Sequence, residues 1–153
     1  MKIMDILVRD AVTVELESET KDGVLQEMTR ALAAARPGLD PGQLLKVLRE
    51  REALQSTGIG EGVAIPHGKL PDLGDFLASF ARSSKGVDFD SIDGEPTRLF
   101  FLLVVPENSG GQHLKALARI SRFCRDASFR EKLMRAEAPE DVFHALEEED
   151  GRF

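Results

Sequence analysis

The stretch "LFFLLVV", residues 99–105, is an unbroken run of large apolar side chains. A strand with one face in water alternates apolar and polar residues, whereas a strand covered on both faces is apolar throughout. The run therefore predicts a central strand in a sheet that has other layers packed against both of its faces. After Pro106 the spacing of apolar residues becomes helical, so we expect the strand to end there.

Three shorter segments that precede this run are also predicted to be strands. They are "TVEL" (13–16), "GVAI" (62–65) and "FLASFAR" (76–82). The first alternates and contains β-branched residues, as short strands do. The turn signal Asp93-Gly94 lies between the last of them and the central run, which indicates that these two strands are antiparallel neighbours.

Five other segments have the apolar spacing of helices. They cover residues 24–35, the segment that begins at 41, and residues 114–125, 128–136 and 139–149. The second helix is marked by Asp40 as its N-cap and by Pro41 in its first turn. For the helix over 114–125, we expect a buried stripe made of Leu114, Leu117, Ala118, Ser121 and Cys124.

Strands and helices alternate along the chain, and at least one pair of strands forms a hairpin. This order predicts an α/β fold in which helices flank both faces of a mixed parallel/antiparallel sheet. No internal repeat and no low-complexity linker is visible. We therefore expect residues 1–153 to form a single domain.

The composition narrows the class of protein. The formal net charge is −7 and the chain has neither Trp nor Tyr, whereas nucleic-acid-binding proteins need a basic surface, so we expect no nucleic-acid partner. No apolar run approaches the roughly 20 residues of a membrane-spanning helix, and the amino terminus lacks the apolar core of a signal peptide. The only cysteine, Cys124, cannot form an internal disulfide. We expect a cytoplasmic protein without membrane insertion.

One of only three histidines lies within "GVAIPHGKL", residues 62–70. Pro66 has a fixed φ and no N–H, so we expect the strand to end there and to project His67 out of the sheet. Gly68 allows a tight exit and the close approach of another molecule. A neutral imidazole offers a nucleophilic nitrogen at cellular pH. The pattern favours a reactive histidine, although the residues alone leave a plain surface histidine as the alternative.

Three other chemistries fit the sequence less well. Gly62 and Gly68 are one residue too far apart for the phosphate loop G-x-x-x-x-G-K-[ST], and Leu70 replaces its Ser or Thr. The segment "GIGEG" (58–62) lacks the third glycine of the dinucleotide fingerprint and is either a donor-rich turn or a structural one. The histidines have no paired spacing, and there is no companion cysteine for a zinc site.

His113 stands at the start of the predicted helix over 114–125. Backbone donors and the helix dipole favour an anion at such a position. If the ends of the two strands over 62–65 and 99–105 lie side by side, the two imidazoles could face each other. His67 would then carry a phosphoryl group, and His113 would donate a hydrogen bond to it. The third histidine, His144, is expected to be structural.

A guanidinium is the group best suited to bind the same anion, because it forms two parallel bonds to phosphate. From spacing alone Arg49 and Arg51 are equal candidates. Ser56 and Thr57 would add hydroxyl donors or merely cap the loop. Lys69 would neutralise charge near the anion or merely face solvent.

Two blocks, "REALQSTGIGEGVAIPHGKL" and "FDSIDGEPTRLFFLLVVPENSGGQHLKALARIS", resemble the enzyme IIA domains of the bacterial phosphotransferase system (PTS EIIA type 2, fructose/mannitol-like), and most closely their nitrogen-regulatory branch. The resemblance implies a three-layer α/β/α fold. It implies that His67 accepts a phosphoryl group on Nε2, that His113 is the second active-site histidine, and that Arg51, not Arg49, is the active-site arginine. Glu61 departs from the small or amide residue expected in its loop, which suggests weakened phosphoryl affinity or altered docking.

The residues predicted to contact the phosphoryl group are Ser56, Thr57, Gly68 and Lys69. The implied donor is a histidine phosphocarrier protein (HPr- or NPr-like), and no metal or nucleotide cofactor is needed. The implied function is regulation of target proteins, such as potassium transporters or sensor kinases, by the phosphorylation state. The alternatives are a sugar-specific component that passes phosphate to a permease domain, and an interaction module that is never phosphorylated.

Overall fold

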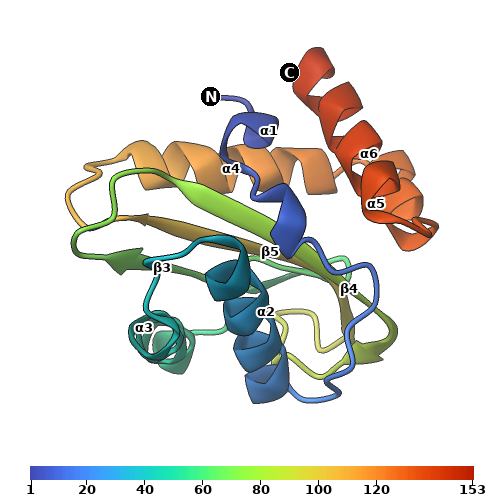
Figure 1. Cartoon of the computed structure of the whole chain (residues 1–153). Coiled ribbons are helices and arrows are strands. Elements are labelled where there is room, and N and C mark those ends of the chain that lie inside the picture. Colours follow the sequence, from blue (N-terminus) through green and yellow to red (C-terminus); the bar gives the residue numbers. More distant parts are fainter.

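A mixed sheet lies between two layers of helices in the computed structural model, which describes all residues from Met1 to Phe153 (Figure 1). The strands are β1 (Gly58–Gly60), β2 (Val63–Ala64), β3 (His67–Leu70), β4 (Leu77–Val87) and β5 (Thr97–Pro106). The helices are α1 (Ile3–Ile6), the 3-10 turn η1 (Arg9–Ala11), α2 (Lys21–Ala35), α3 (Pro41–Leu54), α4 (Gln112–Cys124), α5 (Ala127–Met134) and α6 (Pro139–Arg152). The predicted α/β class with a mixed sheet flanked by helices is confirmed.

The strand β5 is the centre of the sheet. On one side it pairs antiparallel with β4, as the Asp93-Gly94 turn signal predicts. On its other side, β2 and β3 follow one another and both run parallel to it, with Val63 opposite Leu99 and His67 opposite Leu103. β1 folds back antiparallel to β2. The chain from β2 to β3 is thus one extended segment that lies along β5.

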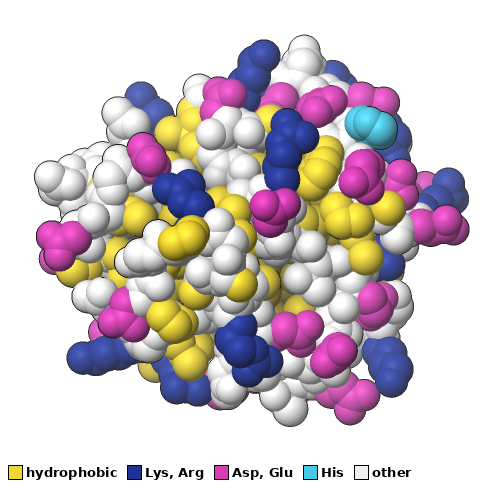
Figure 2. Space-filling view, in the orientation of Figure 1, with side chains coloured by type: hydrophobic (Ala, Val, Ile, Leu, Met, Phe, Trp, Pro, Cys, Tyr) yellow, Lys and Arg dark blue, Asp and Glu magenta, His cyan; other side chains and the backbone are white.

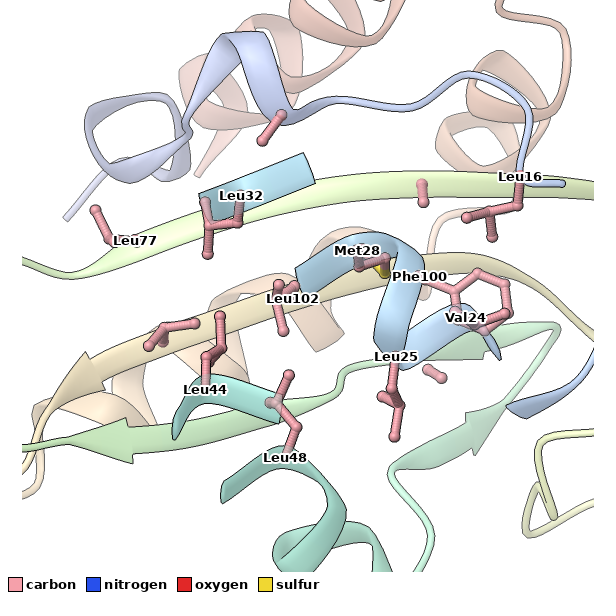
Figure 3. Packing of buried hydrophobic residues seen from close by; sticks show 14 of the residues in the cluster. Leu16, Val24, Leu25, Met28, Leu32, Leu44, Leu48, Leu77, Phe100 and Leu102 are labelled. Atoms are coloured by element: carbon pink, nitrogen blue, oxygen red, sulfur yellow. The ribbon is translucent and has the colours of Figure 1, made fainter. Parts of the chain in front are cut away.

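Both faces of β5 are covered, as its continuous apolar sequence predicts. Alternate residues, among them Phe100 and Leu102, face α2 and α3 (Figure 3). The intervening residues, among them Leu99 and Phe101, face the layer that contains α4, α5 and α6. The labelled side chains that fill the first core are Leu16, Val24, Leu25, Met28, Leu32, Leu44, Leu48, Leu77, Phe100 and Leu102.

The start of α3 has the predicted geometry. The Asp40 carboxylate accepts hydrogen bonds from the amides of Gly42, at 2.9 Å, and Gln43, at 3.3 Å, and Pro41 occupies the first turn. These bonds satisfy amides that have no partner inside the helix. The cap therefore sets where α3 begins, and its far end reaches the edge of the sheet at β3.

The prediction of a strand over 13–16 is wrong. Within this segment only Thr13 forms an isolated bridge to the outer edge of β4, with Ala81, and the preceding chain forms another, between Leu7 and Ala78; residues 14 and 15 bend away from the ladder. The Leu16 amide adds one more bond, to the Arg82 carbonyl. Leu16 instead turns into the core beside α2. Its burial explains the apolar signal without a continuous ladder.

The predicted stripe of α4 is also wrong in part. Its fully buried residues are Ala116, Ile120, Phe123 and Cys124, whereas Leu114 is 61% exposed. Ile and Phe remove more apolar surface from water than Ala or Ser do, so they determine which side of the helix faces the sheet. The rotation leaves Leu114 on the surface next to His113.

The surface seen in Figure 2 intermixes acidic, basic and apolar side chains. None of the helices combines the length and the apolar character needed to cross a bilayer. The two chain ends meet on the α4 side of the sheet, where the Asp150 carboxylate accepts bonds from the amides of Ile3 and Met4.

Candidate active site

A pocket of about 530 Å³ opens at the edge of the sheet formed by β3, between α3 and the first turn of α4. It contains both histidines that the sequence singles out, His67 and His113, together with Arg51 and Lys69. The residues that line it are Val47, Glu50, Arg51, Leu54, His67, Gly68, Lys69, Leu103, Val105 and His113. The two imidazoles therefore share one cavity, as the sequence predicts.

His67 does not stand at the tip of a strand, which corrects the expectation that the strand ends at Pro66. Pro66 lacks an N–H and interrupts the ladder to β5, but its carbonyl accepts a bond from the Leu103 amide at 3.0 Å. Pairing resumes at His67, the first residue of β3. A strand edge next to two helices, and not a projecting tip, therefore positions this half-buried side chain.

The orientation of the His67 ring leaves one nitrogen free. Its Nδ1 lies 2.9 Å from the carbonyl oxygen of Ile65. A carbonyl can only accept a hydrogen bond, so Nδ1 carries the proton and Nε2 keeps a lone pair. Burial of the ring lowers the pKa of His67 below its ordinary 6.5; the bond to Ile65 opposes this shift, and the nearby charge of Arg51 lowers the pKa further. The ring is therefore neutral and nucleophilic at neutral pH.

His113 is held in a matching way in the first turn of α4. Its Nδ1 lies 3.0 Å from the carbonyl of Gly110, which adopts the left-handed φ of +63° in the turn before the helix. This bond again assigns the proton to Nδ1 and leaves Nε2 without a protein partner. Each ring thus brings one unpaired Nε2 to the region that the two side chains share.

The structure separates the two arginines that the sequence could not distinguish by spacing. Arg51 lines the pocket and donates from Nη1 to the Gln55 carbonyl at 2.7 Å. Arg49 faces α2 instead, where its guanidinium binds the Asp22 carboxylate at 2.8 Å and holds the pKa of Asp22 at about 2. Only Arg51 can therefore reach an anion in the pocket.

The sequence profile of the family "Phosphoenolpyruvate-dependent sugar phosphotransferase system, EIIA 2" matches residues 5–149. The chain belongs to this EIIA family. It is 42% identical over 146 residues to a nitrogen regulatory protein of Bradyrhizobium diazoefficiens, and the match covers 95% of each chain.

Two further proteins are similar to this chain. The crystal structure of the nitrogen regulatory protein IIA-Ntr from Neisseria meningitidis superposes with a TM-score of 0.87 at 34% identity, covering 94% of this chain and 98% of that one. A fructose-specific EIIABC component of Bacillus subtilis is also 34% identical, but the match covers 98% of this chain and only 24% of that longer protein.

Ser56 and Thr57 are not where the sequence prediction places them, because neither residue lines the pocket of this EIIA domain. The Ser56 hydroxyl donates to the Phe89 carbonyl at 2.7 Å. The Thr57 hydroxyl donates to the buried carboxylate of Glu52. Both hydroxyls satisfy internal acceptors, so neither points to an anion beside His67.

Gly68 does line the pocket, but packing explains why it is a glycine. A Cβ at this position would lie 3.0 Å from a methyl group of Val47 in α3, so the missing side chain allows the helix to approach β3 closely. Lys69, the next residue, is exposed and lines the pocket. Of the four predicted phosphoryl contacts, the structure thus brings Gly68 and Lys69 to the pocket.

The pocket contains residues that the sequence analysis did not identify. Leu103 and Val105 from β5 are buried and belong to its wall, Leu54 is 83% exposed at its mouth, and Glu50 adds a carboxylate. Leu54 does not lie on the inner stripe of α3, which runs through Leu44 and Leu48. Its position in the helix therefore indicates, from the sequence alone, that it is exposed. Leu103 and Val105 carry no such signal.

Glu61 does not line the pocket, so its carboxylate does not weaken phosphoryl affinity by direct contact. It occupies the β1–β2 turn with a φ of +57°, its amide donates to Asp93 at 3.2 Å, and its carboxylate lies 3.5 Å from the Arg130 guanidinium.

His144 lies in α6, beside a separate hollow that includes Lys132. No three or more His, Cys, Asp or Glu side chains are grouped so that they could hold a metal ion.

Proposed function

We propose that this EIIA domain accepts a phosphoryl group on Nε2 of His67 from a histidine phosphocarrier protein, and that its phosphorylation state regulates target proteins. One observation carries the proposal. The Nδ1–H of His67 is fixed on the Ile65 carbonyl, so the free nitrogen belongs to a pocket that also contains His113, Arg51 and Lys69. Residues 1–153 would act as one unit in this reaction.

The transfer proceeds between two nitrogen atoms. The Nε2 lone pair of His67 forms the new bond to phosphorus while the bond between phosphorus and the donor's histidine nitrogen breaks, and its electron pair returns to the donor ring. His67 keeps its Nδ1 proton and becomes positively charged. The Ile65 carbonyl stabilises that charge, because it accepts a charge-assisted hydrogen bond at 2.9 Å.

The charge on the phosphoryl oxygens is balanced by Arg51 and Lys69. Arg51 offers a planar pair of N–H groups that fits two oxygens at once, whereas Lys69 is a point charge. His113 would contact the same phosphoryl group through Nε2, the ring nitrogen that has no protein partner. Phosphoryl transfer needs mainly positioning and charge stabilisation from the protein, and this pocket provides both.

The mouth of the pocket supports a protein as the donor. Leu54, at the end of α3, and Leu114, in the first turn of α4, are large apolar side chains that are 83% and 61% exposed. Leu54 lines the pocket and Leu114 follows His113, which also lines it. Exposed apolar side chains around a site are typical of protein interfaces. A phosphocarrier that covered both leucines would bring its own histidine to His67.

The regulatory role rests on the relatives. The nitrogen regulatory proteins of B. diazoefficiens and N. meningitidis match this chain over nearly the whole length of both partners. The fructose-specific relative of B. subtilis contains a comparable segment within a much longer protein. We therefore favour phosphorylation-dependent binding of regulated proteins over transfer to a sugar permease, with potassium transporters and sensor kinases as the target classes to test.

The test is to mix the chain with a carrier that bears radiolabelled phosphohistidine and to follow the label on a gel. We expect the wild-type chain to take up label that is stable in base and lost in acid. His67→Ala should take up none, because it lacks the acceptor nitrogen. His144→Ala, which changes a histidine in α6 outside the pocket, should take up label normally.

Circular dichroism should show that His67→Ala is folded, and His67→Gln provides a second variant of more similar size. Normal labelling of either variant would exclude His67 as the acceptor. Failure of the folded wild-type chain to take label from any histidine phosphocarrier would favour the alternative hypothesis, an interaction module that is never phosphorylated.

A further inference from the structure

The "STGIG" block contains a feature that the proposed reaction leaves unexplained. Ser56 and Thr57 do not line the pocket, yet their hydroxyls are bonded to the Phe89 carbonyl and to the Glu52 carboxylate. Ser56 Oγ also accepts a bond from the Gly58 amide at 3.1 Å. The peptide between α3 and β1 is therefore held to the rest of the protein by hydrogen bonds at both of these residues.

Glu52 is the centre of this arrangement. It lies on the inner stripe of α3, four residues after Leu48, and its side chain is only 5% exposed. Its carboxylate accepts bonds from the Thr57 amide at 3.2 Å and from the Thr57 hydroxyl, and it pairs with Lys21 Nζ at 2.8 Å. A buried carboxylate is costly unless it is paired and hydrogen-bonded, and these donors provide both.

The attached peptide leads directly to Arg51. Gln55, the residue before Ser56, ends α3 in an extended conformation, and its carbonyl accepts the bond from Arg51 Nη1 at 2.7 Å. A carbonyl can hold a guanidinium at a defined place only if its own peptide is fixed. Thr57 and Glu52 provide that fixation two and three residues away from Gln55.

We propose that Thr57 and Glu52 are positioning residues, which hold the Gln55 carbonyl so that the guanidinium of Arg51 is kept at the edge of the pocket. The inference rests on the proposed phosphoryl transfer for its kinetic consequence. The hydroxyl that the sequence assigns to the phosphoryl group thus acts on that group only through Arg51.

Thr57→Val is the direct test, because it keeps the shape of the side chain and removes the hydroxyl. In single-turnover transfer from a phosphorylated carrier, we expect the maximal rate to fall about tenfold, since small displacements of a positioned group are costly. The carrier concentration at half-maximal rate should stay within about twofold, because Thr57 is buried and does not contact the donor. Thr57→Ser, which keeps a hydroxyl, should recover the rate to within about twofold of the wild type.

The decisive comparison combines this substitution with Arg51→Ala. If Thr57 acts through Arg51, then adding Thr57→Val to Arg51→Ala should slow the reaction by less than about twofold further. Thr29→Val is a matched control, because Thr29 is equally buried, in α2, and its hydroxyl has no hydrogen-bond partner. This control should leave the transfer rate unchanged.

A second measurement does not depend on phosphoryl transfer. The ¹⁵N relaxation of the Arg51 Nε–H group should show a rigid side chain in the wild type and in Thr57→Ser, and a mobile one in Thr57→Val. A rigid Arg51 in folded Thr57→Val, or a full additional loss of rate in the Arg51→Ala background, would overturn the inference. A wild-type chain that accepts no phosphoryl group refutes the proposed function instead, and the relaxation result still decides the role of Thr57.

Discussion

The extended segment that lies along β5 has two ends of opposite character. At the β1–β2 end the backbone turns through Gly60, Glu61 and Gly62, all with positive φ. Its polar groups find partners within the protein: the Glu61 amide bonds to Asp93, the Gly62 carbonyl accepts two β5 amides, and the Glu61 carboxylate pairs with Arg130. This end has the glycine-rich sequence of an anion-binding loop but the contacts of a structural turn.

At the β3 end, by contrast, polar atoms are left without partners inside the protein. His67 and His113 each use Nδ1 in a bond to a backbone carbonyl, and each leaves Nε2 unpaired. The unsatisfied polar groups, and not the number of glycines, therefore indicate where a ligand binds. A group without an internal partner is available for an external one.

After loss of His67 itself, removal of the second histidine is expected to have the largest effect on the β3 end. We expect His113→Ala to slow phosphoryl acceptance by about ten- to a hundredfold, because one charge-assisted hydrogen bond contributes about 1.5–3 kcal/mol and each 1.36 kcal/mol is a factor of ten. Single-turnover labelling measures the rate, and calorimetry with the unphosphorylated carrier should show unchanged docking. An unchanged rate would show that the two rings do not act on the same group.

The pH dependence of the reaction tests whether the unpaired Nε2 of His67 is the acceptor. Because burial lowers the pKa of His67, the ring stays neutral from pH 6.5 down to its folded-state pKa, and acceptance should persist over that range. Below the folded-state pKa, protonation of Nε2 removes the lone pair, and the rate should fall about tenfold per pH unit. The unfolded chain binds this proton at higher pH than the folded chain does, so stability should decrease as pH falls from 6.5 through the folded-state pKa.

Two measurements check this prediction. An NMR titration of the His67 ring gives its pKa directly, and labelling rates across the same range give the kinetic value. Arg51→Gln removes a charge that lowers the pKa, so it should shift the titration of His67 to higher pH. A kinetic midpoint above 6.5 in the wild type would contradict the assignment of a neutral, half-buried nucleophile.

The smallest effect is expected at the opposite end of the segment. Glu61→Gln should change the acceptance rate by less than about twofold, since exposed ion pairs contribute about 1 kcal/mol at most and this one lies outside the pocket. Labelling kinetics measure the acceptance rate, and a thermal melt measures the contribution of the ion pair to stability. A severalfold faster acceptance would show that the carboxylate acts on the phosphoryl group over a long distance, and that the two ends are not independent.

Local patterns predicted most elements of the fold. The central strand, the hairpin partner β4, the start of α3 at Asp40 and the end of α2 at Ala35 all follow from residues close in sequence. The errors in the fold are the strand over 13–16, the buried stripe of α4 and the strand end at Pro66, and they arise where packing or pairing decides between alternatives of similar local preference. Apolar residues show that a segment is buried, but they do not show what covers it.

The candidate site was predicted less completely. Spacing could not separate Arg49 from Arg51, and the resemblance that chose Arg51 agrees with its place in the pocket. Hydroxyls at Ser56 and Thr57 look like donors to an anion, yet their acceptors, Phe89 and Glu52, are inside the protein. A hydroxyl can satisfy either kind of acceptor, and only the folded chain shows which one is near.

The sequence is enough to predict that an apolar strand is buried between two layers and that the histidine next to Pro66 is the reactive candidate. Those properties depend on side-chain chemistry and on short-range backbone constraints. Only the folded chain shows that the condition for His67 and His113 to share a pocket is met, that Arg51 reaches this pocket, and that Glu61 does not. These outcomes depend on contacts between residues far apart in the chain, which the pairing of β3 with β5 and the rotation of α4 bring about.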